Sequence, residues 1–279
     1  DNKLAVQSLA GLGGEEQVPA VVYICHMDTV TTGEGWTVSP FGAEVIKGRI
    51  YGRGACDMKS GLACALSAFT SMALKARDGQ KPKRTLVFIG TVDEEDFMRG
   101  AEAAIADGWV TKDCWVLDTE PTNGRIEVAH KGRTWFEITV KGITAHASTP
   151  WKGADAIAAM AELISFIRRR IASCPVHPDL GASTVTFGQI EGGYRPYVVP
   201  DSCRVWIDMR LVPPTDTTSA VTIVEDAIAD AIQEIPGITA SYQITGNRPY
   251  VEKDEQSPLL KALGEACQKV TGEPAAVSF

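Results

Sequence analysis

The sequence lacks the features that mark membrane proteins and nucleic-acid-binding proteins. No apolar run approaches the roughly 20 residues that a membrane-spanning helix needs. Basic residues are too few to form the patches that attract phosphates, since 27 Lys and Arg stand against 35 Asp and Glu and the net charge is −8. We therefore expect neither a membrane nor a nucleic acid as the partner.

Several motifs of other enzyme classes are also absent. The sequence contains no Gly-x-Ser-x-Gly elbow of serine hydrolases and no Gly-x-x-x-x-Gly-Lys-Ser/Thr phosphate loop. Its seven cysteines are scattered, and no Cys-x-x-Cys pair occurs among them. Such cysteines are typical of reduced thiols, so we expect a cytoplasmic protein.

The 279 residues are enough for two domains. Short apolar strands first alternate with helices, which predicts an α/β domain with a mostly parallel sheet covered by helices. These elements are expected at 18–25, 59–76, 85–91, 100–106 and 115–117. A β-α-β-β-α-β order follows, at 134–141, 153–171, 183–190, 203–211, 215–235 and 238–245. That order is typical of a ferredoxin-like α+β domain with an antiparallel sheet.

The pattern predicts a discontinuous organisation. Residues 131–245 are expected to form an inserted domain, and 1–130 with 246–279 the domain around it. Ser257-Pro258 predicts the start of a helix at 259–270, and a strand is expected from 275 to 278. Because the sequence starts at Asp1 rather than Met and stops within a strand, we expect it to be incomplete at both ends.

Polar residues with metal-binding side chains follow three of the expected strands. His26-Met27-Asp28, Asp93-Glu94-Glu95 and Asp118-Thr119-Glu120 each come directly after an apolar strand. In open α/β sheets, ligands bind outside the carboxyl ends of the strands. This pattern predicts a hydrolytic metal site, although a structural histidine or a solvated acidic turn would account for each segment taken alone.

Individual positions suggest individual roles. If the first strand continues to Asp28, His26 and Asp28 share a face, so that Asp28 would orient the imidazole while Cys25 packs on the other face. Asp57 lies in a glycine-rich turn and would either cap the next helix or bridge two metal ions. Of the neighbours Glu94 and Glu95, one would ligate metal and the other hold a proton.

Asp118 and Glu120 both remain candidates for the next ligand. The resulting mixture of one imidazole and several carboxylates suits zinc, cobalt or manganese. Two such ions would polarise a carbonyl and activate water near neutral pH.

The sequence resembles the co-catalytic dizinc aminoacylase and carboxypeptidase family, which includes acetylornithine deacetylase, succinyl-diaminopimelate desuccinylase and bacterial glutamate carboxypeptidase. The matching stretches occur in the family's order and span most of the chain. They are HMDTV at 26–30, GRGACDMKSG at 52–61, TVDEE at 91–95, EPT at 120–122, GITAHASTP at 142–150 and VPDSCRVWIDMR at 199–210. The resemblance implies a catalytic α/β domain with an inserted ferredoxin-like domain that serves as lid and dimerisation domain.

The resemblance also implies roles for particular residues and a cofactor of two Zn²⁺ ions. His26 and Glu120 would bind one ion, with Asp118 as the reserve ligand. Asp57 would bridge both ions and Glu95 would bind the second. Among catalytic residues, Glu94 would be the general base, Asp28 would support His26, and His146 would stabilise the oxyanion, in relatives often across a homodimer interface. Arg210 would hold a substrate carboxylate.

Two positions depart from the family pattern. The family's last zinc ligand is a histidine near the C-terminus, and none of His26, His130, His146 and His177 has that context. We expect this ligand beyond Phe279. Many relatives have Asn where this sequence has Tyr197, which would then face the substrate and alter its selection.

We therefore expect a dizinc amidohydrolase that cleaves the amide bond of an N-acyl amino acid or small peptide, with zinc-bound hydroxide as nucleophile and Glu94 as base. Two alternatives remain open: a di- or tripeptide aminopeptidase, and a catalytically silent, metal-stabilised binding protein.

Overall fold

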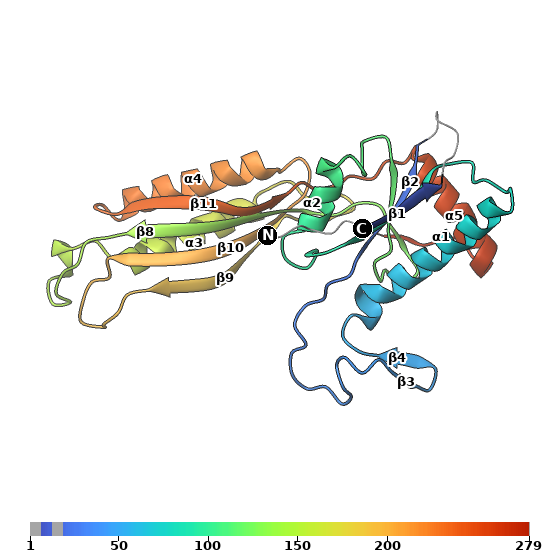
Figure 1. Cartoon of the computed structure of the whole chain (residues 1–279). Coiled ribbons are helices and arrows are strands. Elements are labelled where there is room, and N and C mark those ends of the chain that lie inside the picture. Colours follow the sequence, from blue (N-terminus) through green and yellow to red (C-terminus); the bar gives the residue numbers. More distant parts are fainter. Residues whose placement is uncertain (1–6, 13–18, 279) are drawn as a thin grey trace. The chain divides into compact units, whose positions relative to one another are not determined.

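A computed structural model of the chain describes residues 7–12 and 19–278. The chain divides into two compact units, Asp1–Gly124 and Arg125–Phe279. Figure 1 shows the strands and helices of the chain. Val18, the expected start of the first predicted strand, lies outside the described residues.

The first unit is built on a four-stranded sheet in the order β1-β5-β2-β6. Its strands are β1 (Gln7–Leu12), β2 (Val21–His26), β5 (Leu86–Thr91) and β6 (Trp115–Asp118). β2 pairs in parallel with both β5 and β6, while β1 pairs antiparallel with β5 at the edge. The predicted mostly parallel sheet is confirmed, with an antiparallel edge strand that the sequence did not predict.

Helices cover both faces of this sheet because successive side chains of a strand point to opposite faces. Cys25 and Phe88 pack with Phe69 of α1 (Gly61–Arg77), whereas Val22 and Ile89 pack near α2 (Arg99–Ala106). Cys25 is 1% exposed and is a packing residue, as predicted. An exposed hairpin of β3 (Glu44–Ile46) and β4 (Arg49–Tyr51), also not predicted, precedes α1. Between them lies a kinked turn, η1 (Ala55–Ser60), in which Asp57 and Met58 have non-helical backbone angles.

The second unit contains a four-stranded antiparallel sheet in the order β11-β8-β10-β9. Along the chain the order is β8 (Gly132–Lys141), α3 (Ala156–Ala172), β9 (Thr184–Gly192), β10 (Ser202–Leu211), α4 (Thr217–Glu234) and β11 (Thr239–Arg248). This is the β-α-β-β-α-β arrangement that the sequence predicts. A short 3₁₀ helix, η2 (Pro150–Lys152), precedes α3.

One face of this sheet forms the largest core of the molecule. The alternating residues Val205, Ile207, Met209 and Leu211 of β10 are all at most 3% exposed and pack with α3 and α4. The period-two pattern of the sequence therefore identified the buried face correctly.

The remaining elements of the second unit come before β8 and after β11 along the chain. β7 (Ile126–Glu127) pairs in parallel with β12 (Val277–Ser278), and α5 (Pro258–Thr271) precedes β12. Ser257 caps α5 and Gly272 ends it with a left-handed φ of 81°, as Ser257-Pro258 and Gly272 predict. That residues 131–245 are a separate domain inserted into 1–130 and 246–279 stays a prediction. In the part of the chain that the structure describes, no helix has the length and apolarity to cross a bilayer.

Candidate metal centre

Three side chains of the first unit converge on one point. His26 is the last residue of β2, Asp57 lies in η1, and Glu120 follows the end of β6 by two residues. The Nε2 atom of His26 is 3.2 Å from Asp57 Oδ1 and 3.3 Å from Glu120 Oε1. One potential ligand atom from each residue lies within 4.8 Å of the others, so the three can bind a common metal ion.

The imidazole of His26 contacts Asp28 through its second ring nitrogen. Its Nδ1 lies 3.0 Å from the carbonyl oxygen of Asp28 and 3.6 Å from Asp28 Oδ1. Both are acceptors, so they favour a proton on Nδ1, and this tautomer would leave Nε2 for a metal. Asp28 Oδ1 is buried and has no hydrogen-bond partner among the described residues, so it adds negative charge beside the ring.

Several carboxylates surround His26 and repel one another, which favours a bound cation. Burial lowers the pKa of the 2%-exposed His26, but the charges of Glu120 and Glu94 overcome this effect, and the pKa is raised. Partial burial raises the pKa of Glu120 to about 7, with further contributions from the charges of Asp118 and Asp57. A divalent ion would relieve this repulsion, and one nitrogen with several carboxylate oxygens fits zinc, cobalt or manganese.

Glu94 lies beside the three converging residues. Its Oε2 is 3.9 Å from His26 Nε2, and its side chain is 36% exposed. Burial raises the pKa of Glu94; His26 opposes this, and the charge of Glu95 adds to it. A carboxylate with a raised pKa beside potential metal ligands has a property typical of groups that exchange protons in active sites.

Glu95 and Asp118 lie outside the group of three. Glu95 Oε1 accepts the Val30 N–H at 3.2 Å, and the Glu95 N–H donates to Asp28 Oδ2 at 3.3 Å. Asp118 ends β6 and pairs with Ile24. The structure thus brings Glu120, and not Asp118, next to His26, while the ligand roles of all three acidic residues stay predictions.

An ion pair that the sequence analysis missed holds the segment that carries Glu94. Arg99, at the start of α2, donates to both carboxylate oxygens of Asp93 at 2.6 Å. These bonds lower the pKa of Asp93 to about 2. Asp93 adopts a left-handed φ of 66°, so the chain turns sharply just before Glu94. The acidic run itself gave no signal for this contact, because it depends on a residue six positions away.

The other predicted site residues belong to the second unit. His146 is exposed, and its Nδ1 accepts the Ser148 N–H at 3.2 Å, so in the neutral ring Nε2 carries the proton. Arg210 binds both carboxylate oxygens of Asp208 at 2.9–3.1 Å. Tyr197 is 58% exposed.

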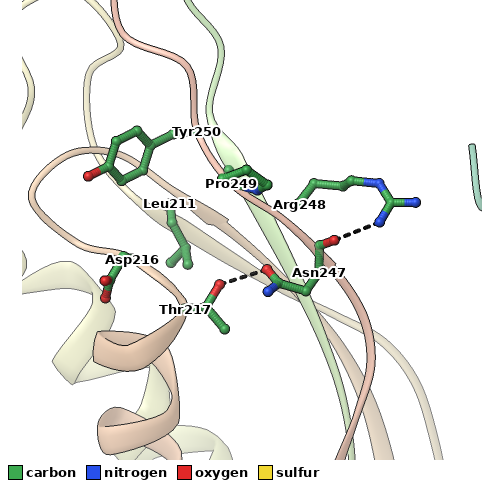
Figure 2. Close-up of a pocket in the computed structure, with 8 residues that line it drawn as sticks. Leu211, Asp216, Thr217, Asn247, Arg248, Pro249 and Tyr250 are labelled. Atoms are coloured by element: carbon green, nitrogen blue, oxygen red, sulfur yellow. Dashed lines mark hydrogen bonds between the residues drawn. The ribbon is translucent and has the colours of Figure 1, made fainter. Parts of the chain in front are cut away.

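The second unit also contains a pocket of about 370 Å³ beside the start of α4 (Figure 2). In it, the Thr217 hydroxyl donates to Asn247 Oδ1 at 2.7 Å. Its lining comprises Gly132, Leu211, Asp216, Thr217, Asn247, Arg248, Pro249 and Tyr250. None of these is a predicted ligand or catalytic residue, so the pocket gives no second candidate for the metal site.

The stability of the metal-free protein should depend on pH through Glu120. In the folded state its pKa is about 7 against an ordinary 4.5, so the folded protein holds a proton that the unfolded chain releases between these values. Stability is then lost as the pH rises from 4.5 towards 7. The raised pKa of His26 acts in the same direction. We expect the unfolding temperature of the metal-free protein to fall over this range.

Glu120→Gln tests this dependence, because glutamine keeps the shape and removes the titration. The variant should show a flatter profile than the parent protein when both are measured by calorimetry in chelator. Equal slopes for the two proteins would show that Glu120 does not titrate as the geometry indicates.

Comparisons with known proteins agree with this geometry. The model of the family described as Peptidase family M20/M25/M40 matches residues 22–278. An acetylornithine deacetylase of Vibrio cholerae serotype O1 is 29% identical over 250 residues, which cover 88% of this chain and 65% of the relative. A probable succinyl-diaminopimelate desuccinylase of Staphylococcus aureus is 26% identical over 272 residues, again 88% of this chain and 65% of the relative. The chain thus spans 65% of the length of these curated relatives.

Solved structures show the same fold. An aminopeptidase PepT from Bacillus cereus superposes with a TM-score of 0.72 and 22% identity, over 97% of this chain and 69% of that one. A tripeptidase from Staphylococcus aureus gives a TM-score of 0.75 with 22% identity, over 96% of this chain and 69% of that one.

Proposed function

The chain belongs to peptidase family M20/M25/M40, and from this membership we propose that it is a metal-dependent amidohydrolase that cleaves the amide bond of an N-acyl amino acid or small peptide. The convergence of His26, Asp57 and Glu120, with Glu94 3.9 Å from His26 Nε2, is the main support. The deacetylase and desuccinylase activities named for two relatives support the choice of an acylated amino acid as substrate.

Two Zn²⁺ ions, or Co²⁺ or Mn²⁺ in their place, are the proposed cofactor. His26 and Glu120 would bind one ion, Asp57 would bridge both, and Glu95 would bind the second after releasing the Val30 N–H. Such ions supply Lewis acidity, which polarises the scissile carbonyl and acidifies water. The additional histidine that the family resemblance predicts for the second ion is not among these residues and stays a prediction.

The protein's own residues would move the proton and hold the substrate. Glu94 would take a proton from the attacking water and deliver it to the leaving amine, a task suited to its raised pKa. Asp28, whose carbonyl oxygen lies 3.0 Å from Nδ1 of His26, would keep the proton on that nitrogen. The Nε2–H of His146 would donate to the developing oxyanion.

Arg210 and Tyr197 are the proposed substrate-binding residues. The guanidinium of Arg210 already binds the carboxylate of Asp208 through three contacts. A substrate carboxylate would therefore compete with Asp208 for the same donors. The exposed ring of Tyr197 would contact the substrate where many relatives offer an amide.

We also propose that residues 131–245 form an inserted lid and dimerisation domain of a cytoplasmic homodimer. Supporting the dimer, β9 lies at the edge of its sheet, and most of its residues are exposed. All seven cysteines are free, which suits a reducing compartment.

Metal removal is the direct test of this function. Dialysis against a chelator should abolish hydrolysis of N-acyl amino acids, and Zn²⁺, Co²⁺ or Mn²⁺ should restore it. Metal analysis before and after dialysis relates the activity to the bound ion. Full hydrolysis by a preparation shown to be free of metal would reject the proposal.

Aminopeptidase activity is the second candidate, because two proteins of this fold are described as an aminopeptidase and a tripeptidase. Parallel assays of acylated amino acids and of di- and tripeptides with free amines separate the two. A full-length protein that binds metal but hydrolyses neither class would instead be the silent, metal-stabilised binding protein.

A further inference from the structure

We propose that Met58 and Lys59 are positioning residues of the metal site, which hold the end of β2 so that His26 faces Asp57 before any metal binds. The inference rests on the proposed function, since it assumes that His26 and Asp57 are ligands. Neither residue would touch metal or substrate. Both act through the backbone of His26 and Met27, and we call these four residues the ligand clasp.

Met58 supplies a hydrogen-bond acceptor that the sheet does not. Backbone N–H groups alternate in direction along a strand, and the Met27 N–H donates to Thr91 on β5. The His26 N–H therefore points towards β6, but β6 pairs with β2 only as far as Ile24 and Asp118. The Met58 Sδ takes the place of the missing strand and accepts the His26 N–H at 3.0 Å.

The setting of Met58 makes this bond important. His26 is 2% exposed and Met58 is fully buried, so water cannot replace a lost acceptor. A buried N–H without a partner is unfavourable, and the end of β2 would shift to satisfy it. Such a shift would move the His26 ring away from Asp57.

Lys59 fixes the next residue along the strand. Its Nζ donates to the carbonyl oxygen of Met27 at 2.7 Å. Lys59 is an exposed residue, yet its side chain folds back over the turn, with Nζ only 3.1 Å from where a Cβ on Gly54 would lie. This ammonium therefore links the turn to the end of β2 through the Met27 carbonyl.

The turn that presents these residues has a defined shape. Gly54 begins it with a left-handed φ of 81°, and a Cβ there would lie 2.6 Å from Thr29 Cγ2. The Lys59 N–H closes it by donating to the Gly54 carbonyl at 3.0 Å. The consecutive residues Asp57, Met58 and Lys59 thus contact the His26 ring, the His26 N–H and the Met27 carbonyl in turn.

Preorganisation is the expected benefit. Partners that orient a metal ligand typically change metal affinity by about 10–100-fold when they are removed. The alternative is that Met58 only packs in the core and Lys59 only lies on the surface. Replacing Met58 would then change the free energy of unfolding, and replacing Lys59 would have no effect. In neither case would the affinity of the folded protein for metal change.

The test is a metal titration of the full-length protein after chelation, with Zn²⁺ and Co²⁺ as probes. Lys59→Met removes the ammonium and Met58→Leu removes the acceptor while keeping an apolar side chain. Each should weaken metal affinity by at least about 10-fold. Lys59→Arg, which retains a cationic donor, should recover most of that loss. Unfolding temperatures of the metal-free variants are measured alongside to separate affinity from stability.

Matched controls repeat the same exchanges elsewhere. Lys112→Met alters an exposed lysine, and Met160→Leu alters a fully buried methionine in the core of the second unit. Neither should change metal affinity by more than about twofold, well below the effect of removing an orienting partner. If Met58→Leu does not fold, the metal affinity of Lys59→Met alone tests the proposal. Lys59 is exposed, so its replacement should leave the protein folded.

The outcomes distinguish this proposal from the one on which it rests. If the parent protein binds metal and both Met58→Leu and Lys59→Met bind it with unchanged affinity, the positioning role is rejected and the proposed function is not affected. A parent protein that binds neither Zn²⁺ nor Co²⁺ would overturn both.

Discussion

Replacing Glu94 by glutamine is expected to stop catalysis and to leave metal binding intact. The Glu94 carboxylate lies 3.9 Å from His26 Nε2 but outside the group formed by His26, Asp57 and Glu120. Glutamine keeps the size of the side chain and removes its ability to take a proton. Loss of a general base typically lowers turnover by about 10²–10⁴-fold. The measurement is turnover of an N-acyl amino acid together with metal content per chain.

Asp96→Asn is the matched control for Glu94→Gln. It removes one negative charge from an exposed residue two positions further along the same loop. Turnover close to that of the parent protein is expected for Asp96→Asn. Near-normal turnover by Glu94→Gln would remove Glu94 as the base, and loss of metal by this variant would show that Glu94 is a ligand instead.

Gly61→Ala is expected to damage the site through the backbone that carries Glu120. Gly61 has ordinary helical angles, φ −63° and ψ −45°, so alanine would suit its conformation. A Cβ at this position, however, would lie 1.8 Å from the carbonyl oxygen of Thr119, between Asp118 and Glu120. Either α1 or the Glu120 segment must move to avoid this overlap.

The expected cost is large for so small a change. Overpacking of this kind typically destabilises by about 1–3 kcal/mol, which lowers the unfolding temperature by several degrees. Displacement of Glu120 should also weaken metal affinity. Calorimetry and metal titration of the same preparation measure both effects.

Gly264→Ala provides the comparison, since Gly264 also lies in a helix, α5, but has no atom within 4 Å of the position of an added Cβ. There the substitution should be neutral or stabilise by up to about 1 kcal/mol, as in other helix interiors. Equal tolerance of alanine at the two glycines would contradict the close approach of α1 to Thr119.

The sequence predicted those elements whose residues are buried in a regular pattern. Apolar runs such as 85–91 and alternation such as that of β10 correspond to strands with one or two covered faces. The hairpin of β3 and β4 escaped prediction because all six of its strand residues are exposed, so no apolar alternation marks it. β1 was missed because its short sequence, QSLAGL, is rich in small residues.

The sequence predicted those site residues that lie at or just after the ends of strands. His26 ends one strand and Glu94 follows another by three residues, and the sheet brings both to one edge. The choice between Asp118 and Glu120 was not predictable, because strand alternation stops at the end of β6. Met58 and Lys59 resembled the ordinary start of a helix at residue 59, whereas the structure has a kinked turn over Ala55–Ser60 and begins α1 at Gly61.

The dispersed origin of the three converging side chains links metal binding to folding. His26, Asp57 and Glu120 come from a strand end, a turn and a loop, and they meet only when the parallel strands have paired. An unfolded chain offers no comparable group, so a bound ion adds its binding free energy to that of the fold. At an ion concentration 100 times the dissociation constant, this amounts to about 2.7 kcal/mol. A bound ion would therefore stabilise the folded state, and the free energy of unfolding would depend on the concentration of that ion.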